Sequence, residues 1–349
     1  MPRSSRPPSR HTPGRAYRPA WWVPGAHLRT LWARVFRRIE LPPVTRLRWE
    51  TPDGDFVDLV RLDAPPDRPR LVLTHGLEGT TRSPYARGLL HEVAARGWGA
   101  DLLLFRSCSG EINRARRFYH SGETGDLAFV VDRILAEFPR APLGLAGVSL
   151  GGNVLLKYLG EHGDALDPRI AGAVAISVPY DLGRGSRWFG RGFGKVYERY
   201  FLKSLLRKTR AKAARFPDLV DLARLEQVRT LLEFDEIVTG PLHGFASADD
   251  YYDRSSALRF LAGVRRPTLL LSAIDDPFLP AEVLDEVRAV ARDNPALETE
   301  FVDKGGHVGF VAGRVPWRPF YYAEWRVTDF LAPRFAELLA QRPAGSAGR

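Results

Sequence analysis

The stretch Gly147-Val148-Ser149-Leu150-Gly151-Gly152 decides the fold. It follows the apolar run Leu143 to Val148 and precedes a helical run from Asn153 to Gly160. Strand, sharp turn and helix in this order are the setting in which the pattern G-x-S-x-G carries a nucleophilic serine. The backbone of that serine is strained, and the residues two positions before and after it crowd one another, so both must be glycine. Gly147 and Gly151 satisfy this requirement, which makes Ser149 the candidate nucleophile.

Short β-rich runs alternate with helical runs on both sides of this turn. Repeated strand, helix and strand predict a mostly parallel central sheet with helices on both faces. Functional groups in such sheets lie at the carboxyl ends of the strands. The expected strands are Val57 to Leu62, Leu71 to Thr74, Ala100 to Phe105, Leu143 to Val148, Ile170 to Val178, Thr268 to Ser272 and Glu298 to Val302. The expected helices fall near residues 84 to 97, 123 to 139, 151 to 162, 281 to 293 and 318 to 341.

A serine hydroxyl needs a base to take its proton, and the base needs an acid to orient it. In this arrangement the chain order is serine, acid and histidine. The expected strand Thr268 to Ser272 is followed by a loop with two acids, and we favour Asp276, which precedes a proline, over Asp275. Of the eight histidines, His307 alone lies beyond this loop. The sequence therefore predicts a catalytic triad of Ser149, Asp276 and His307.

Two backbone amides are expected to hold the oxyanion that forms when the serine attacks a carbonyl. The first is the amide of Leu150, at the start of the helix that follows the nucleophile. The second should come from the loop His75-Gly76-Leu77-Glu78-Gly79, after the run Leu71 to Thr74, where we expect the Leu77 amide to be the donor. His75 precedes the nucleophile in the chain, so we expect it to make structural hydrogen bonds rather than to act as the base.

The alternation of strands and helices stops between about residues 180 and 262, where we expect a helical cap insertion over the strand ends. Residues 183 to 216 hold eleven lysines and arginines and one acid, Glu198, whereas residues 217 to 254 hold nine acids and three arginines. We expect the two halves to form ion pairs with each other. A nucleic-acid surface on the basic, aromatic-rich first half is the alternative, and self-pairing is favoured because it accounts for both halves.

The positive charge of the chain is concentrated at its N-terminus. The net charge is +10, and residues 1 to 48 hold eleven arginines and one acid, Glu40, so the remainder is neutral. Residues 1 to 20 are expected to form a disordered basic leader before a single domain from 21 to 349. The apolar spacing from Leu28 to Ile39 predicts a short basic amphipathic helix. We expect its apolar face to dock on the protein itself; peripheral contact with an anionic membrane is the alternative.

Composition excludes several other classes of protein. Hydrophobic residues make up 44% and charged residues 26%, which is typical of a globular chain and not of a disordered or fibrous one. No apolar run reaches the about 18 residues that predict a membrane span. Cys108, the single cysteine, cannot form an intrachain disulfide and fits a reducing, cytoplasmic location. Without C-x-x-C, H-E-x-x-H or P-loop patterns, no metal, cofactor or nucleic-acid partner is expected.

Several segments resemble the YheT-like hydrolases, family 4 of the AB hydrolase superfamily. They are Gly25 to Trp32, His75 to Gly79, Phe105 to Glu111, Tyr119 to Thr124, Gly147 to Asn153, Glu233 to Asp235, Pro241 to Phe245, Asp275 to Phe278 and Gly305 to Phe310. The resemblance implies an α/β-hydrolase fold and carboxylesterase or acyl-hydrolase activity, with Ser149, Asp276 and His307 at the triad positions. Arg29 stands where the family usually has Gln and Ser107 where it usually has Gly, so substrate choice does not carry over.

These observations favour the hydrolysis of small-molecule or lipid carboxylic esters through an acyl-enzyme that water resolves. Acyl transfer is an alternative, in which an alcohol replaces water in the second step, and an apolar cap that sheds water would favour it. A third hypothesis belongs to a different class of protein. It is a non-catalytic scaffold that keeps the fold and recruits a membrane through its basic leader.

Overall fold

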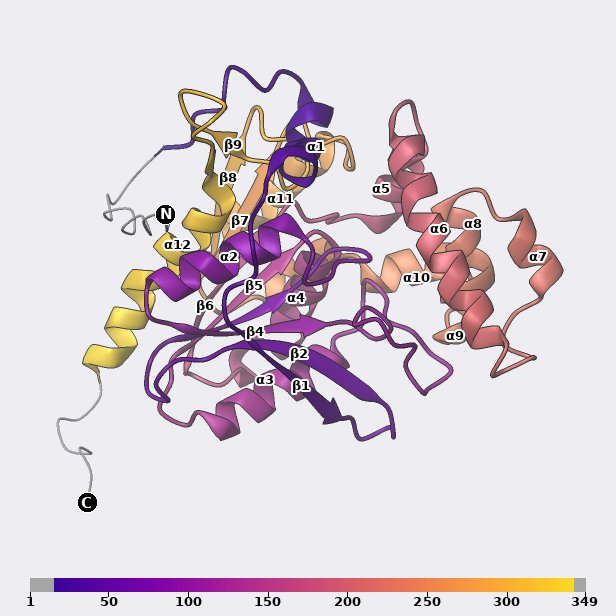
Figure 1. Cartoon of the computed structure of the whole chain (residues 1–349), viewed down its shortest axis with the longest axis horizontal. Helices are drawn as coiled ribbons and strands as arrows, with labels where there is room; N and C mark the ends of the chain where they lie inside the picture. Colours follow the sequence, from indigo (N-terminus) through magenta and orange to yellow (C-terminus); the bar gives the residue numbers. More distant parts are fainter. Residues whose placement is uncertain (1–15, 342–349) are drawn as a thin grey trace, which may run out of the picture.

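The computed structural model describes residues 16–341. Its centre is an eight-stranded sheet in the order β1-β2-β4-β3-β5-β6-β7-β8 (Figure 1). β2 pairs antiparallel with both β1 and β4, and the other neighbours in this sheet pair in parallel. The strands are β1 (Thr45–Glu50), β2 (Phe56–Leu62), β3 (Arg70–Thr74), β4 (Gly99–Leu104), β5 (Leu143–Val148), β6 (Ile170–Ile176), β7 (Thr268–Ala273) and β8 (Leu297–Val302).

The expected mostly parallel sheet is confirmed. The sequence did not predict β1, an edge strand in which only Trp49 is buried, because such a strand carries no continuous apolar run. The central strands β3, β5 and β7 are buried along their whole length, as expected for strands that helices cover on both faces. On β3, Leu71 and Leu73 pack into the hydrophobic core on one face, and Val72 packs into the core on the other.

Helices cover both faces of the sheet. One layer contains α2 (Pro84–Ala95) and α12 (Tyr322–Ala340), and the opposite layer contains α3 (Gly125–Glu137), α4 (Leu150–His162) and α11 (Glu282–Asp293) (Figure 1). α1 (Ala26–Phe36) lies beside α2, and a short antiparallel pair, β9 (Val311–Ala312) and β10 (Phe320–Tyr321), precedes α12. The expected layering is therefore confirmed.

The chain between β6 and β7 leaves the sheet and forms a group of helices at one side of it (Figure 1). Lys212 fastens this insertion to the body, because its buried Nζ donates hydrogen bonds to the Asn113 Oδ1 (2.6 Å) and to the carbonyl oxygens of Ala115 (2.7 Å) and Arg117 (2.8 Å). The helices are α5 (Leu182–Phe189), α6 (Gly194–Ala213), α7 (Leu222–Gln227), α8 (Leu231–Phe234), η2 (Asp235–Thr239), α9 (Gly240–Leu242), α10 (Ala248–Ser255) and η3 (Ala257–Gly263).

The expected self-pairing of the insertion's charges is wrong. Within the described chain, one ion pair, Arg187 with Asp249, joins the basic residues 183 to 216 to the acidic residues 217 to 254. The reason lies in the orientation of α6. Its inward bases reach the body, where Lys208 pairs with Glu78 and Lys212 donates to backbone carbonyls. Its other bases are exposed and have no carboxylate of the described residues within 4.0 Å.

The described chain starts within the predicted leader. Residues 1–15 lie outside the described residues, but residues 16–20 pack on the body, which differs from the disorder expected up to residue 20. The Tyr17 ring lies 5.9 Å from that of Phe310, Pro19 forms a β-bridge with Ala312, and Ala20 is buried. None of the helices between residues 16 and 341 combines the length and hydropathy that spanning a bilayer requires.

The expected docking of an apolar α1 face is confirmed only in part. Trp32 packs on the body, with its ring 4.8 Å from that of Trp22, beside the buried Ala20, Val23 and Val311. The one buried residue of α1 is Arg29, and Leu28, Val35 and Phe36 are exposed. The physical reason is that the inward face of the helix is used for polar contacts. Arg29 forms an ion pair with Asp275, 3.2 Å away, and the Thr30 Oγ1 accepts a hydrogen bond from the His307 amide.

Candidate active site

Ser149 occupies the sharp turn between β5 and α4. Its backbone has φ 55° and ψ −121°, in the left-handed region that a non-glycine residue rarely adopts. A Cβ atom on Gly147 would lie 2.5 Å from the Gly151 carbonyl oxygen, and one on Gly151 would lie 2.5 Å from the His75 carbonyl oxygen. Only glycine fits at these two positions, so the crowding expected around the serine is present in the structure.

The structure brings the three expected triad residues together. The His307 Nε2 lies 2.9 Å from the Ser149 Oγ, and the His307 Nδ1 lies 2.9 Å from the Asp276 Oδ2. A carboxylate only accepts, so Nδ1–H donates to Asp276, which leaves Nε2 to accept from the serine hydroxyl. The ring of Phe278 stacks on the imidazole with a centroid distance of 4.0 Å. The histidine is therefore held by a hydrogen bond at one edge and a ring on one face.

Asp275 precedes Asp276, but it contacts the backbone of the loop that carries His307 and not the imidazole ring. Its Oδ1 accepts hydrogen bonds from the amides of Gly305 (2.7 Å) and Gly306 (2.8 Å), and its Oδ2 pairs with Arg29. A Cβ on Gly306 would lie 2.6 Å from the Ala26 carbonyl oxygen, so the loop packs directly on α1. The sequence analysis missed these roles of Asp275 and Arg29. The sequence feature that could have indicated these roles is the segment Gly25 to Trp32, which the sequence analysis used only as part of the family resemblance.

The two expected oxyanion donors both lie beside Ser149. Leu77 and Leu150 line the same pocket as the serine, and a Cβ on Gly76 would lie 3.1 Å from the Ser149 Cβ. The Leu77 amide donates to no protein acceptor within residues 16–341. Leu150 is the first residue of α4, where amides have no acceptor inside the helix. Both amides are thus free to donate to a bound oxygen.

His75 makes the structural hydrogen bonds expected of it. Its fully buried ring donates from Nδ1 to the Gly76 carbonyl oxygen (2.7 Å) and accepts at Nε2 from the Phe105 amide (3.1 Å). Burial lowers the pKa of the imidazole to about 4, so the ring is neutral at physiological pH. Both ring nitrogens are used within the protein, which leaves none for a substrate.

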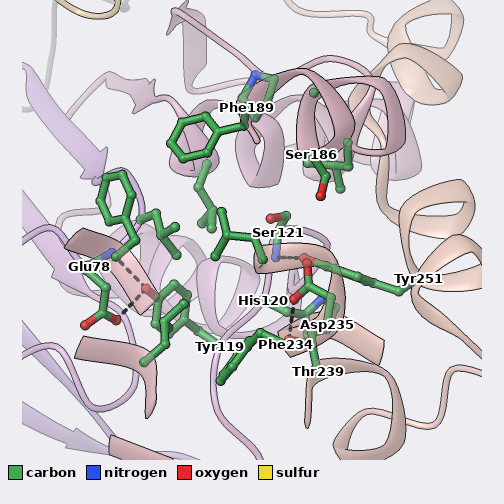
Figure 2. Close-up of a pocket in the computed structure, with 18 of the residues that line it drawn as sticks. Glu78, Tyr119, His120, Ser121, Ser186, Phe189, Phe234, Asp235, Thr239 and Tyr251 are labelled. Atoms are coloured by element: carbon green, nitrogen blue, oxygen red, sulfur yellow. Dashed lines mark hydrogen bonds between the residues drawn. The ribbon is translucent and has the colours of Figure 1, made fainter. Parts of the chain in front are cut away.

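Glu78 forms hydrogen bonds that connect the insertion with the loop that carries Leu77. Its backbone amide donates to the Tyr119 Oη (2.9 Å), whose hydroxyl donates to the Glu78 Oε1 (2.9 Å) (Figure 2). The same oxygen accepts from the Lys208 Nζ (2.7 Å) of α6, and the Ser204 hydroxyl donates to Oε2. Glu78 has φ 55°, a strained conformation that these contacts hold. Sequence reasoning did not predict this cluster, since no local pattern marks it.

Cys108 lies beside the same cluster, with its Sγ 3.4 Å from the Lys208 Nζ. Burial raises the pKa of the thiol to about 12. The residue is therefore a protonated, inert thiol, in agreement with the preference for serine as the nucleophile.

A pocket lies between the insertion and the carboxyl ends of the strands, with Ser149 and His307 in its wall. Figure 2 shows its polar end, where Asp235 accepts a hydrogen bond from the Thr239 Oγ1 (2.6 Å). Asp235 also accepts a hydrogen bond from the Tyr252 Oη (2.8 Å). Burial raises the pKa of Asp235 to about 6. The remaining wall is mostly apolar and comes from both the body and the insertion: Leu77, Phe118, Leu150, Leu182, Phe189, Phe201, Leu205, Leu231, Phe234, Val238 and Phe278.

Metal-binding clusters are absent from the described part of the chain, in which no three His, Cys, Asp or Glu residues are grouped to hold an ion.

Comparison with known proteins places the chain in a family. Residues 69–313 match the model of the alpha/beta hydrolase fold family. The chain is 40% identical over 311 residues to the "Putative esterase YheT" of Escherichia coli, covering 87% of this chain and 89% of that protein. It is 29% identical to the "Monoacylglycerol lipase" of Saccharomyces cerevisiae over 278 residues, which cover 76% of this chain and 59% of that protein.

Among solved structures, the esterase Pf2001 of Pyrococcus furiosus aligns with a TM-score of 0.56 at 16% identity, covering 86% of this chain and 99% of that one. At this identity the likeness concerns the fold alone. The chain belongs to the α/β-hydrolase fold family and, within it, to the YheT-like hydrolases.

Proposed function

We propose that this protein is a serine hydrolase of carboxylic esters, with Ser149 as nucleophile, His307 as base and Asp276 as the acid that orients it. The observation that carries the proposal is the pair of 2.9 Å contacts that join Ser149 Oγ to His307 Nε2 and His307 Nδ1 to Asp276 Oδ2. Relatives that are named as an esterase and a lipase support an ester as the bond that is cleaved.

In the first half of the reaction, the Ser149 Oγ attacks the ester carbonyl carbon and its proton passes to the His307 Nε2. The amides of Leu77 and Leu150 donate to the oxyanion of the tetrahedral intermediate. Asp276 stabilises the imidazolium through Nδ1–H and keeps its own charge. When the intermediate collapses, the bond to the alcohol oxygen breaks, and His307 gives its proton to that oxygen. The product is an acyl-enzyme on Ser149.

In the second half, water takes the place of the alcohol. His307 removes a proton from the water, whose oxygen attacks the acyl carbonyl, and the same two amides hold the oxyanion. Collapse breaks the bond to the Ser149 Oγ, which recovers its proton from the imidazolium. The carboxylic acid leaves, and the enzyme returns to its starting state.

The mostly apolar wall of the pocket supports an ester with an apolar acyl or alcohol portion, because burial of that portion against aromatic and aliphatic side chains is favourable. Small-molecule and lipid esters both meet this condition. The proposed mechanism uses only side chains and backbone amides of the protein and includes no cofactor.

The proposal is tested by the hydrolysis of short p-nitrophenyl esters by the purified protein and by its Ser149→Ala variant. The expected result is turnover by the wild type and a decrease in kcat of at least about 10⁴-fold in the variant. Circular dichroism of both proteins controls for folding. Equally slow hydrolysis by two folded proteins would rule the proposal out.

Acyl transfer is the second candidate function. The apolar lining of the pocket favours it, because a site that excludes water allows an alcohol to compete for the acyl-enzyme. Analysis of the products in the presence of an added alcohol distinguishes the two reactions. A new ester that increases with alcohol concentration supports transfer. Carboxylic acid as the sole product at every alcohol concentration excludes it.

A further inference from the structure

The outward face of α6 and the loop before it carry positive charge that the protein does not neutralise. Within residues 16–341, none of the bases on this face lies within 4.0 Å of a carboxylate. All of them are exposed, and those on α6 recur at helical spacing: Arg191, Lys195, Arg199, Lys203, Arg207 and Arg210. The acidic half of the insertion does not approach them, so their counter-charge has to come from outside the molecule.

Large apolar side chains are exposed among these bases. They are 40 to 53% exposed and lie on α5, on α6 and in the loop between them: Trp188, Phe193, Val196 and Tyr200. Isolated exposed apolar residues are ordinary, but aromatic residues interleaved with bases on one helical face are typical of a surface that meets a lipid headgroup layer.

This surface continues onto α1. The His27 ring lies 4.7 Å from that of Phe193, and the Arg34 guanidinium donates to the Tyr200 Oη (2.6 Å). α1 contributes the exposed side chains of Leu28, Val35 and Phe36, which the polar inward face of that helix leaves outside. We call the exposed side chains of α1, α5 and α6 together the outer basic surface.

The opposite face of α5 and α6 lines the candidate substrate pocket through Phe189, Phe201 and Leu205. The same two helices, which Figure 1 shows at the side of the insertion nearest α1, therefore separate the pocket from the outer basic surface. An apolar ester reaching the pocket from a membrane would have only this layer of helices to pass.

We propose that the outer basic surface docks on an anionic phospholipid bilayer. The charge is complementary to lipid phosphates and serine headgroups, and the exposed aromatic and aliphatic side chains can enter the interface between headgroups and acyl chains. A nucleic acid would match the charge but offers no apolar layer for Val196, Val35 and Leu28. The contact differs from one made by residues 1 to 20 alone, because it is built on folded helices next to the pocket.

The test is sedimentation of the full chain with vesicles of phosphatidylcholine alone or mixed with phosphatidylserine. The wild type is expected to bind the mixed vesicles and to be released by salt. The triple variant Arg199→Gln, Lys203→Gln, Arg210→Gln should bind them about 100-fold more weakly. The matched control is Arg68→Gln, Arg133→Gln, Arg292→Gln, which removes the same charge from exposed positions on the body and should bind like the wild type.

A second variant, Phe193→Ser with Val196→Ser, tests the apolar part of the contact. It keeps every charge and should reduce binding to the mixed vesicles at low salt, where the wild type stays bound. Hydrolysis of a short water-soluble ester by each variant controls for folding. The proposal does not rest on the catalytic function, because Ser149→Ala is expected to sediment like the wild type.

Three results would overturn the proposal. One is equal binding of the triple variant and the wild type to mixed vesicles. Another is equal loss of binding in the triple variant and its control, which would assign the effect to net charge. The third is a triple variant that loses affinity for an oligonucleotide while vesicle binding is unchanged, which would identify a nucleic acid as the partner.

Discussion

The loops at the carboxyl ends of the sheet and the outward face of α6 use charged side chains in different ways. In the loops, three buried or partly buried carboxylates next to the site have partners within the protein: Asp276 has His307, Asp275 has Arg29, and Glu78 has Lys208. On α6, the outward bases have no carboxylate within 4.0 Å among the described residues. The loop carboxylates are paired and mostly buried, and they hold the site in its geometry. The bases of α6 are exposed and unpaired, and they are available to bind another molecule.

Loss of the carboxylate that contacts the imidazole is expected to have the largest effect of the pairings within the loops. Asp276→Asn should lower kcat by about 10⁴-fold, because an amide does not hold the histidine in the required tautomer. Asp275→Asn is the matched control at the adjacent position. It should have a much smaller effect, since Asp275 contacts the amides of Gly305 and Gly306 rather than the imidazole.

Steady-state kinetics of the two variants with a p-nitrophenyl ester measure this difference. Equal losses in kcat from both substitutions would contradict the separate roles of the two aspartates.

The next largest effect is expected on the stability of the fold, from loss of the ion pair between Lys208 of the insertion and Glu78 of the body. Lys208→Met leaves the carboxylate of Glu78, with 7% of its side chain exposed, without its cation and should destabilise the fold by about 3 kcal/mol. Adding Glu78→Gln to this variant removes the unpaired charge and should restore most of the stability. Chemical denaturation of the wild type, both single variants and the double variant completes the cycle. Additive losses would show that the two residues do not interact.

Asp235 gives a smaller effect, which depends on pH. Its folded pKa of about 6 lies above its ordinary value, so the folded protein retains a proton that the unfolded chain loses between about pH 4 and about pH 6. Stability therefore falls as the pH rises through that window, and above it the ionised Asp235 costs a constant amount. Asp235→Asn lacks this titration.

The melting temperature of Asp235→Asn relative to the wild type should thus be higher at about pH 8 than at about pH 4, by several degrees. Thermal unfolding followed by circular dichroism at both pH values measures the shift. A difference between the two proteins that does not change with pH would mean that Asp235 is ionised at an ordinary pKa.

The parts of the site that the sequence predicted follow either from local spacing or from the order of elements along the fold. The turn at Ser149 follows from two glycines at fixed spacing, and the assignment of His307 follows from chain order along a parallel sheet. The contacts that the sequence did not predict join distant segments. Arg29 and Asp275 are 246 positions apart, and Lys208 and Glu78 are 130 apart, so no local pattern marks either pair.

The prediction for α1, which holds for only part of its apolar face, and the wrong prediction for the insertion share a physical cause. Both predictions were based on the number and spacing of charged or apolar residues, and these do not determine which face of a helix packs against the body. On α1, burial of Arg29 against Asp275 leaves Leu28, Val35 and Phe36 exposed, although Trp32 packs on the body. On α6, Lys208 and Lys212 lie against the body, and the other bases are left exposed to solvent without a partner in the acidic half. Composition gives the charges of a helix, but tertiary contacts decide its orientation.

Assignment of the nucleophile is tested most directly by covalent labelling with a fluorophosphonate, followed by mass spectrometry of the intact protein and its peptides. The expected result is one adduct per chain, on the peptide that contains Ser149, with no adduct in Ser149→Ala and slow labelling in His307→Ala. An adduct on another residue, or a folded wild-type protein that takes up no label, would contradict the assignment of Ser149.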